Sequence, residues 1–189
     1  MEIFVTRHGQ TNWNFLGKIQ GKTDIELNET GKLQAKETGE KIKEEKIDLI
    51  IASPLKRARE TAEIINSNFG VQILEDERLM ERGFGKSEGL TKVERSELKV
   101  EHPEVEDIWN YNKNVDFNDI ERMKEFCERI YTCLDEIIEK HKNKNILLVT
   151  HGGVFAIIKC YFNKFPLEQF ISRDTVKSIG NCEIESFKI

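Results

Sequence analysis

Two short apolar runs, each followed at once by a histidine and a glycine, constrain the fold most strongly. The first is IFVTRHG at residues 3–9, and the second is ILLVTHGG at residues 146–153. Runs of this length are typical of buried strands in a parallel sheet. In an open α/β sheet, ligands bind in the crevice beyond the carboxyl ends of the strands. The pattern therefore predicts that His8, Arg7 and His151 reach the ligand-binding edge of such a sheet.

Length and composition limit the class of protein. A chain of 189 residues with 38% hydrophobic and 33% charged residues fits one globular domain. The net charge of -5 argues against nucleic acid as the main partner. No apolar run approaches the roughly 20 residues of a membrane span, and the first residues lack signal-peptide features, so we expect a cytoplasmic protein with no membrane partner. No C-x-x-C pair occurs, and we expect reduced cysteines at Cys127, Cys133, Cys160 and Cys182.

Strand-like runs alternate with helical patterns along the chain. The expected strands cover residues 3–6, 47–52, 71–74 and 146–150. This alternation predicts an α/β fold, a three-layer α/β/α sandwich with a mostly parallel central sheet. The segment 175–189 is expected to form two further short strands around the turn pair at residues 180–181.

Helical periodicity marks the connecting segments. One helix is expected over residues 29–44, one after Gly153, and the longest over residues 118–141, capped by Asn118 or Asp119. Another should begin near Pro54, with Ser53 as its N-cap.

The segment 87–117 differs from the rest of the chain. It is polar, is interrupted by Pro103, and carries Trp109 and Tyr111 in a weakly periodic setting. We interpret it as a small, cap-like helical insertion within a single domain spanning residues 1–189. An irregular surface excursion is the alternative.

Arginine and histidine at a strand end suit an anion better than a cation. The guanidinium of Arg7 can bond phosphate or carboxylate in a bidentate manner, and Gly9 would let a ligand approach the backbone. A single histidine there could be purely structural, but His151 in the same setting favours function. A metal site is disfavoured because the fixed charge of Arg7 would lie beside the cation. We therefore expect no metal.

Two further residues fit an anion site. Arg57 lies in the first turn of a helix that directly follows a strand, where free amides and the helix dipole attract anions. Arg59 lies about 200° around that helix and is expected at the surface. Glu81 lies among apolar residues and glycines, where partial desolvation favours the protonated form that a general acid needs. A surface ion pair and a solvated loop are the respective alternatives.

Taken in order, these motifs resemble those of the histidine phosphatase superfamily, the phosphoglycerate mutase-like proteins. The resemblance spans residues 6 to about 183. It rests on Arg7-His8-Gly9 with Thr11, Trp13 and Asn14, on Gln20-Gly21, on Ser53-x-Leu55-x-Arg57-Ala58 with Thr61-Ala62, on Leu79-x-Glu81 with Phe84-Gly85, on His151-Gly152 and on Asn181-Cys182.

The resemblance implies a mechanism with no cofactor. His8 would accept the phosphoryl group, while Arg7, Arg57 and His151 would hold its oxygens. Glu81 would protonate the leaving oxygen and then activate water. The residues implied to bind the substrate, a small-molecule phosphomonoester, are Asn14, Gln20, Gly21, Arg82 and Gly152.

The branch of the family follows from what surrounds the motif residues. Phe84 stands where the mutases carry a tyrosine, and residues 87–117 contain no adjacent arginines; only Lys92, Arg95, Lys99 and Lys113 are cationic there. This favours a phosphatase acting on α-ribazole phosphate, a sugar phosphate or another small metabolite. A cofactor-dependent phosphoglycerate mutase, suggested by Arg82, and a non-catalytic phospho-ligand binding module are the alternatives.

Overall fold

The central sheet has five strands, in the order β3-β2-β4-β1-β5. The computed structural model describes residues 1–117 and 119–189. All neighbouring strands are parallel except β5, which pairs antiparallel with β1 at one edge. The strands are β1 (Glu2–Arg7), β2 (Leu49–Ala52), β3 (Ile73–Glu75), β4 (Ile146–Thr150) and β5 (Ile184–Lys188). The four expected parallel strands are therefore present, with β2 and β3 shorter than predicted.

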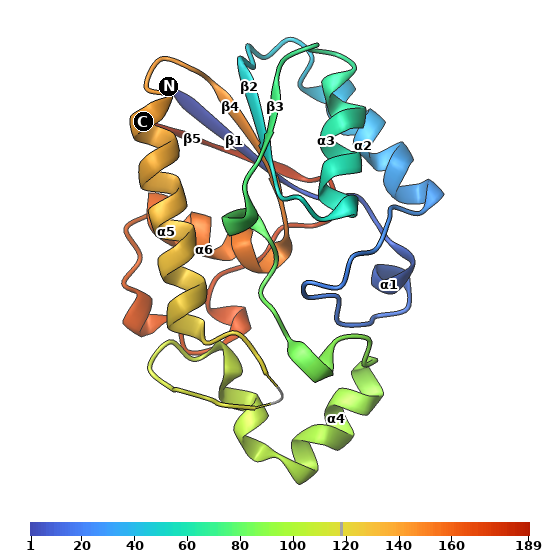
Figure 1. Ribbon diagram of the computed structural model, residues 1–189, viewed down its shortest axis with the longest axis vertical. Coiled ribbons are helices and arrows are strands. Elements are labelled where there is room, and N and C mark those ends of the chain that lie inside the picture. Colours follow the sequence, from blue (N-terminus) through green and yellow to red (C-terminus); the bar gives the residue numbers. More distant parts are fainter. Residues whose placement is uncertain (118) are drawn as a thin grey trace.

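Helices cover both faces of the sheet. Because side chains alternate along a strand, Phe4, Ile50 and Leu147 pack toward α2 (Glu29–Lys41) and α3 (Lys56–Asn66). Ile3 and Leu148 point the other way, into the larger core that holds the long helix α5 (Met123–Lys140) and α6 (Gly152–Phe162). The fold is the three-layer α/β/α sandwich that the sequence predicts (Figure 1).

Strand register brings the two histidines to the same level. Arg7 lies opposite Thr150 in the β1–β4 pair, and the His8 amide continues the ladder by donating to the Thr150 carbonyl at 2.9 Å. Both histidines therefore leave the sheet side by side at its carboxyl end. The two chain termini lie at the opposite end of the molecule (Figure 1).

Two predicted helix starts are wrong. Helix α3 begins at Lys56 rather than Pro54, and its first amide donates to the Asp24 carboxylate at 2.7 Å instead of to Ser53. Helix α5 begins at Met123, after a turn in which Asp119 has a left-handed backbone (φ 59°), and no side chain in residues 1–117 or 119–189 caps it. The other cap considered, Asn118, lies outside the described residues.

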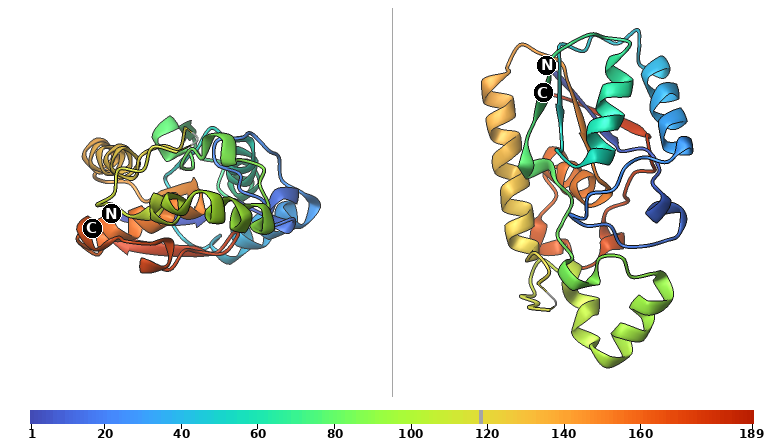
Figure 2. Two further views of the ribbon diagram at one scale, coloured as in Figure 1. Left: turned by 90° about the horizontal axis from the view of Figure 1, so that it is seen from below. Right: turned by 45° about the vertical axis from the view of Figure 1, so that its right-hand side comes forward.

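Short helices cross the carboxyl end of the sheet. Helix α4 (Lys92–Glu101) and the 3-10 helix η3 (Pro103–Trp109) lie beyond the strand ends in Figure 1 and in the right-hand view of Figure 2. They share a small apolar cluster built on Phe84, Val105, Phe117 and Ile120. The remaining short helices are α1 (Asn12–Phe15), η1 (Glu77–Leu79), η2 (Gly85–Ser87), η4 (Leu167–Gln169) and η5 (Arg173–Thr175).

The structure also bears on what the sequence predicts for the C-terminal strands, the cysteines and membrane-spanning segments. The C-terminal segment forms one strand instead of two, because residues 173–175 adopt η5 and only β5 pairs with the sheet. All four cysteines are free and buried. No helix within the described ranges is long and apolar enough to cross a membrane.

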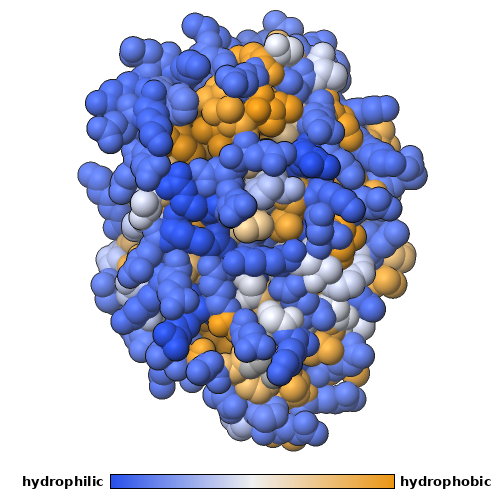
Figure 3. All heavy atoms as spheres, in the orientation of Figure 1, coloured by the Kyte–Doolittle hydropathy of each residue, from blue (hydrophilic) through white to orange (hydrophobic). Residues whose placement is uncertain are grey.

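The face of the molecule in Figure 3 is mainly hydrophilic. Its most apparent apolar patch lies at upper centre, over the region where Figure 1 shows β2 and β3. A shallow hollow beside the edge strand β3 is lined in part by Ile51, Leu74 and Ile137.

Candidate active site

His8 and His151 meet directly beyond the ends of β1 and β4. Their ring centroids are 5.2 Å apart, and both side chains are buried. The structure therefore places the two histidines at one edge of the sheet, as the sequence predicts.

The hydrogen bonds of His8 determine its tautomer. Its Nδ1 lies 2.7 Å from the Gly9 carbonyl oxygen, which can only accept, so Nδ1 carries the proton. The backbone is held as well, because Asn181 donates to the His8 carbonyl at 2.8 Å and the Gly9 amide donates to the Thr61 hydroxyl at 3.0 Å. Burial and the charges of Arg57 and Arg7 lower the pKa of His8 well below 6.5. The ring is therefore neutral, with the lone pair on Nε2.

Gly9 has a different role from the expected one. A Cβ at this position would overlap the carbonyl oxygen of Gly31. The absence of a side chain thus allows the close approach of α2, rather than of a ligand.

Two arginines flank the histidines. Arg57, from the first turn of α3, donates to the carbonyls of Gly21 and Thr23 at 2.7 and 2.9 Å, and Arg7 donates to the Ile179 carbonyl at 3.2 Å. Burial lowers the pKa of both, that of Arg57 to about 10, which leaves both cationic at neutral pH. Arg59 points to the surface and pairs with Glu63, as expected.

Three buried nitrogens at this centre have no hydrogen-bond partner among the described residues. They are the Nε atoms of Arg7 and Arg57 and the Nδ1 atom of His151. The other ring nitrogen of His151 lies 2.8 Å from the Ser53 hydroxyl, which explains why Ser53 does not cap α3. Because buried polar groups are normally satisfied, these nitrogens form a centre suited to oxyanions.

Glu81 approaches the same centre from the segment between η1 and η2. One of its carboxylate oxygens accepts the Arg82 amide at 2.9 Å, and the other accepts the Gly153 amide at 3.0 Å. A Cβ at Gly153 would overlap the Glu81 carboxylate. Gly153 thus both leaves room for Glu81 and orients it from the N-terminus of α6.

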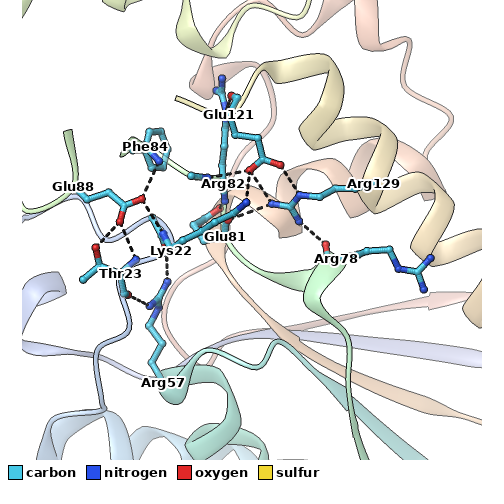
Figure 4. A network of polar contacts seen from close by, with 12 residues as sticks. Lys22, Thr23, Arg57, Arg78, Glu81, Arg82, Phe84, Glu88, Glu121 and Arg129 are labelled. Carbon is cyan, nitrogen blue, oxygen red and sulfur yellow. Dashed lines mark hydrogen bonds and ion pairs between the residues drawn. The ribbon is translucent and has the colours of Figure 1, made fainter. Parts of the chain in front are cut away.

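A polar network supports the backbone of Glu81 (Figure 4). Arg129, on α5, donates to the carbonyls of Arg78 and Glu81 at 2.5 and 3.2 Å. Arg129 also holds the Glu121 carboxylate in a bidentate ion pair, with distances of 2.6 and 3.1 Å. Burial opposes ionisation of Glu121, but the hydrogen bonds and charge of Arg129 leave its pKa below the usual value.

A second carboxylate, Glu88, positions the loop beneath Arg57. It accepts the amides of Lys22, Thr23 and Phe84 at 2.8–3.0 Å and a further hydrogen bond from the Thr23 hydroxyl. This loop supplies the two carbonyls that hold the Arg57 guanidinium (Figure 4). Glu88 therefore acts on Arg57 through the backbone rather than lying in the cavity itself.

Four of these groups, Arg7, His8, Arg57 and Glu81, line a cavity of about 220 Å³. Its lining residues are Arg7, His8, Asn14, Gly17, Lys18, Ile19, Gln20, Gly21, Arg57, Glu81, Phe84, Arg95, Trp109 and Arg173. A larger groove of about 490 Å³ lies between α2 and β5, but it contains neither active-site histidine nor any arginine.

Only some of the residues expected to bind substrate line the cavity. Asn14, Gln20 and Gly21 line the cavity, whereas Arg82 and Gly152 do not. The Arg82 side chain is buried, donates to the carbonyls of Glu121 and Ile108 at 2.8 and 2.5 Å, and stacks 5.0 Å from the Trp109 ring. Arg82 thus holds the insertion against the core.

Some lining residues did not emerge from the sequence analysis as site residues. Lys18, Arg95 and Arg173 come from three segments far apart in the chain. Arg95 was considered only as a mutase feature, and nothing around Arg173 or Lys18 resembles a motif. No cluster of three metal-ligating side chains is present in residues 1–117 and 119–189.

Comparisons with known proteins agree with this geometry. The model of the histidine phosphatase superfamily (branch 1) matches residues 3–189. Phosphoglycerate mutase-like protein 4 of Arabidopsis thaliana is 42% identical over an alignment of 192 residues, covering 100% of this chain and 79% of the relative. The uncharacterized phosphatase PhoE of Bacillus subtilis is 39% identical over 151 residues, or 80% of this chain and 72% of PhoE.

A solved structure is also similar. The phosphoserine phosphatase of Entamoeba histolytica, as a mutant in complex with phosphoserine, has 28% identity and a TM-score of 0.83. The match covers 99% of this chain and 90% of that one.

Proposed function

Because the chain belongs to branch 1 of the histidine phosphatase superfamily and is a phosphatase that acts on small phospho-metabolites, we propose that it works without a metal, through a phosphohistidine on His8. One observation carries this proposal. The Nδ1–H of His8 is donated to Gly9, which leaves the Nε2 lone pair free beside two arginines and Glu81. A neutral imidazole held in one tautomer is a competent nucleophile near pH 7.

The first half-reaction transfers the phosphoryl group to the protein. The Nε2 lone pair of His8 attacks phosphorus, and the bond to the ester oxygen breaks. Glu81, in its protonated form, gives its proton to that leaving oxygen, which departs as an alcohol. The unpartnered nitrogens of Arg7, Arg57 and His151 support a role in binding the three non-bridging oxygens. Donors preset in this way typically lower a barrier by about 3–4 kcal/mol each.

The second half-reaction releases inorganic phosphate. Glu81, now a carboxylate, takes a proton from water while the water oxygen attacks phosphorus. The bond between phosphorus and Nε2 breaks, and its electron pair returns to the neutral ring of His8. Glu81 ends protonated, ready for the next substrate, so atoms and charges balance over the cycle.

A metal ion has no role in this mechanism. Arg7 and Arg57 supply the positive charge that a divalent cation would otherwise provide. Activity should therefore be unchanged in strong chelators, and vanadate should inhibit competitively because it resembles five-coordinate phosphorus. Loss of activity in chelator, restored by a divalent ion, would contradict the metal-free mechanism.

Cavity size bears on the substrate. A volume of about 220 Å³ accommodates a phosphoryl group with a small organic part, such as that of a sugar phosphate or a phosphoserine-sized ester. Phosphoserine is a candidate through the similar Entamoeba histolytica phosphatase. A cofactor-dependent phosphoglycerate mutase is the second candidate, favoured by the extra cationic residues of the cavity.

The role of Glu81 provides the test. Glu81→Gln removes the transferable proton but keeps the shape, so turnover of alkyl phosphates should fall by about 10²–10⁴. Hydrolysis of p-nitrophenyl phosphate should fall much less, because its leaving oxygen scarcely needs a proton. Glu125→Gln, at an exposed ion pair on α5, is the matched control and should change neither rate. Equal losses on both substrates would mean that Glu81 is not the general acid.

A further inference from the structure

The far side of the cavity carries positive charge that the mechanism above does not use. Arg95 projects from α4, Arg173 from η5, and Lys18 from the loop after α1, and all three line the same cavity as His8. They come from segments as much as 155 residues apart (18 to 173). Their convergence is a property of the folded chain.

Among the described residues, these side chains lack a carboxylate partner within 4 Å, unlike four other arginines of the protein. Arg59, Arg78, Arg122 and Arg129 each lie within 4 Å of an Asp or Glu oxygen. No such ion pair involves Lys18, Arg95 or Arg173 within the described part of the chain. In a chain with 34 acidic and 29 basic residues, this arrangement leaves the cavity strongly cationic.

The structure holds two of these groups in place. The Arg95 guanidinium makes long hydrogen bonds to the carbonyls of Thr91 and Gly17, at 3.3 and 3.4 Å. The Arg173 guanidinium lies over the Trp109 ring, 5.5 Å from its centroid. Both contacts orient a cation without neutralising it.

The charges also act on one another. Burial and the charge of Arg173 lower the pKa of Arg95. Burial also lowers the pKa of Arg7, and the charge of Arg173 adds to this lowering. Like charges placed together in a cavity raise its free energy, and a bound anion relieves this repulsion.

A charge count shows how much anion the cavity can take. A phosphoryl dianion at His8 is matched by Arg7 and Arg57, and Glu81 is the one acidic residue among the described lining residues. Lys18, Arg95 and Arg173 then remain. A substrate with a single phosphate and a neutral organic part leaves these three cations without a counter-charge.

We propose that Arg95 and Arg173, assisted by Lys18, form a subsite for a second anionic group on the substrate, a carboxylate or a second phosphate. This inference rests on the proposed phosphatase function and specifies its substrate class. The preferred substrates are small phosphomonoesters with another negative charge a few bonds from the ester, rather than sugar or alcohol phosphates whose organic part is uncharged. Guanidinium groups bind carboxylate and phosphate with matched geometry.

Matched substrates measure the preference. 3-Phosphoglycerate and glycerol 3-phosphate differ by a carboxylate in place of a neutral group, and fructose 1,6-bisphosphate and fructose 6-phosphate differ by one phosphate. We expect kcat/KM for wild type to be about tenfold to a hundredfold higher for the member that carries the second anionic group, in at least one pair. The pair with the larger ratio identifies the second group as carboxylate or phosphate.

Variants assign the preference to residues. Arg95→Gln and Arg173→Gln should each lower the preference ratio about three- to tenfold, and the double variant should nearly abolish it. Lys99→Gln removes the same charge from α4, at an exposed pair with Glu106, and should leave the ratio unchanged. Ratios near one for wild type, or a ratio unaffected by the double variant, would overturn the subsite.

A binding measurement separates this inference from the proposed function. If no monoester, including p-nitrophenyl phosphate, is hydrolysed, the phosphatase proposal fails. Titration calorimetry of 3-phosphoglycerate, fructose 1,6-bisphosphate and their partners that lack the second anionic group, on wild type, still tests the subsite. Tighter binding of a ligand with the second anionic group, lost in the double variant, supports it, and equal affinities within both pairs refute it.

Discussion

Replacing Arg129 by methionine tests how the general acid is positioned. Arg129 does not line the cavity. It donates to the carbonyls of Arg78 and Glu81 and pairs with the Glu121 carboxylate. Arg129→Met keeps most of the apolar stem and removes every one of these hydrogen bonds. Two carbonyls lose their donor, and the Glu121 carboxylate, 12% exposed, keeps the Gly83 amide and the Lys22 ammonium, at 3.5 Å, as its partners among the described residues.

The magnitude follows from this loss. Removing one partner of a fully buried ion pair costs about 3–5 kcal/mol, and partial exposure of Arg129 at 18% reduces this to about 2–4 kcal/mol. For a domain of this size, the melting temperature should fall by roughly 5–15 °C. Because an unpaired carboxylate is the main penalty, adding Glu121→Gln to Arg129→Met should recover about 1–2 kcal/mol.

Catalytic rates distinguish a role of Arg129 in positioning Glu81 from a role in stability alone. A looser Glu81 should lower kcat for an alkyl phosphate by about tenfold, since displacement of a catalytic group by about 1 Å has effects of this size or larger. Hydrolysis of p-nitrophenyl phosphate should fall by much less. Assays use urea and thermal unfolding together with both substrates. Arg122→Met, which removes an exposed ion pair with Glu125 at the start of the same helix, serves as control. A variant as stable as wild type, or one that loses both activities equally, would refute the positioning role.

Three other outcomes follow from the site. Because burial lowers the pKa of His8 and of His151 well below 6.5, the unfolded chain binds more protons than the folded chain below that pH. The free energy of unfolding of the ligand-free protein should therefore fall as pH drops from about 6.5 toward 5.5. Equal free energies from urea titrations at the two pH values would contradict this. Gly153→Ala should lower kcat by at least about tenfold on alkyl phosphates, since its Cβ would displace Glu81 and lie 3.2 Å from Trp109, whereas a wild-type rate would show that Glu81 has room to move. With 3-phosphoglycerate and 2,3-bisphosphoglycerate, phosphate release should exceed isomerisation, and isomerisation about tenfold faster than hydrolysis, a difference of about 1.4 kcal/mol, would identify a mutase instead.

The sequence predicts where His8, His151 and Arg57 lie because local patterns encode their positions. Apolar runs identify the strands, and the identical placement of His8 and His151 after two of them fixes their position at one edge of the sheet. Adjacent pairing of β1 with β4 then makes them neighbours. Arg57 follows the same logic, since a helix start after β2 must lie at that edge.

Predictions fail where a local pattern competes with a distant partner. Ser53-Pro54 is a strong helix start in sequence, but the Ser53 hydroxyl is engaged by His151, 98 residues away. Gly9 looks like a ligand-binding glycine, whereas the constraint comes from the backbone of Gly31 in α2. Arg82 directly follows Glu81, but its guanidinium donates to the carbonyls of Ile108 and Glu121.

Arg95 and Arg173 illustrate a different limit of prediction from sequence. Arg95 lies on an amphipathic, exposed helix and Arg173 in a short irregular segment, so each resembles an ordinary surface residue in sequence. Only the placement of α4 and η5 around Trp109 reveals that both line the cavity. Long-range packing of loops has no period or motif from which it can be predicted.

Trapping the phosphorylated protein tests the central claim most directly. Radiolabelled substrate is mixed with wild type, the reaction is stopped by denaturation in alkali, and peptides are mapped. The account predicts alkali-stable, acid-labile label on the peptide that contains His8. It also predicts neither label nor turnover in His8→Ala, with an unfolding transition that shows the variant is folded. Label on another residue, or appreciable turnover by folded His8→Ala, would contradict the phosphohistidine mechanism.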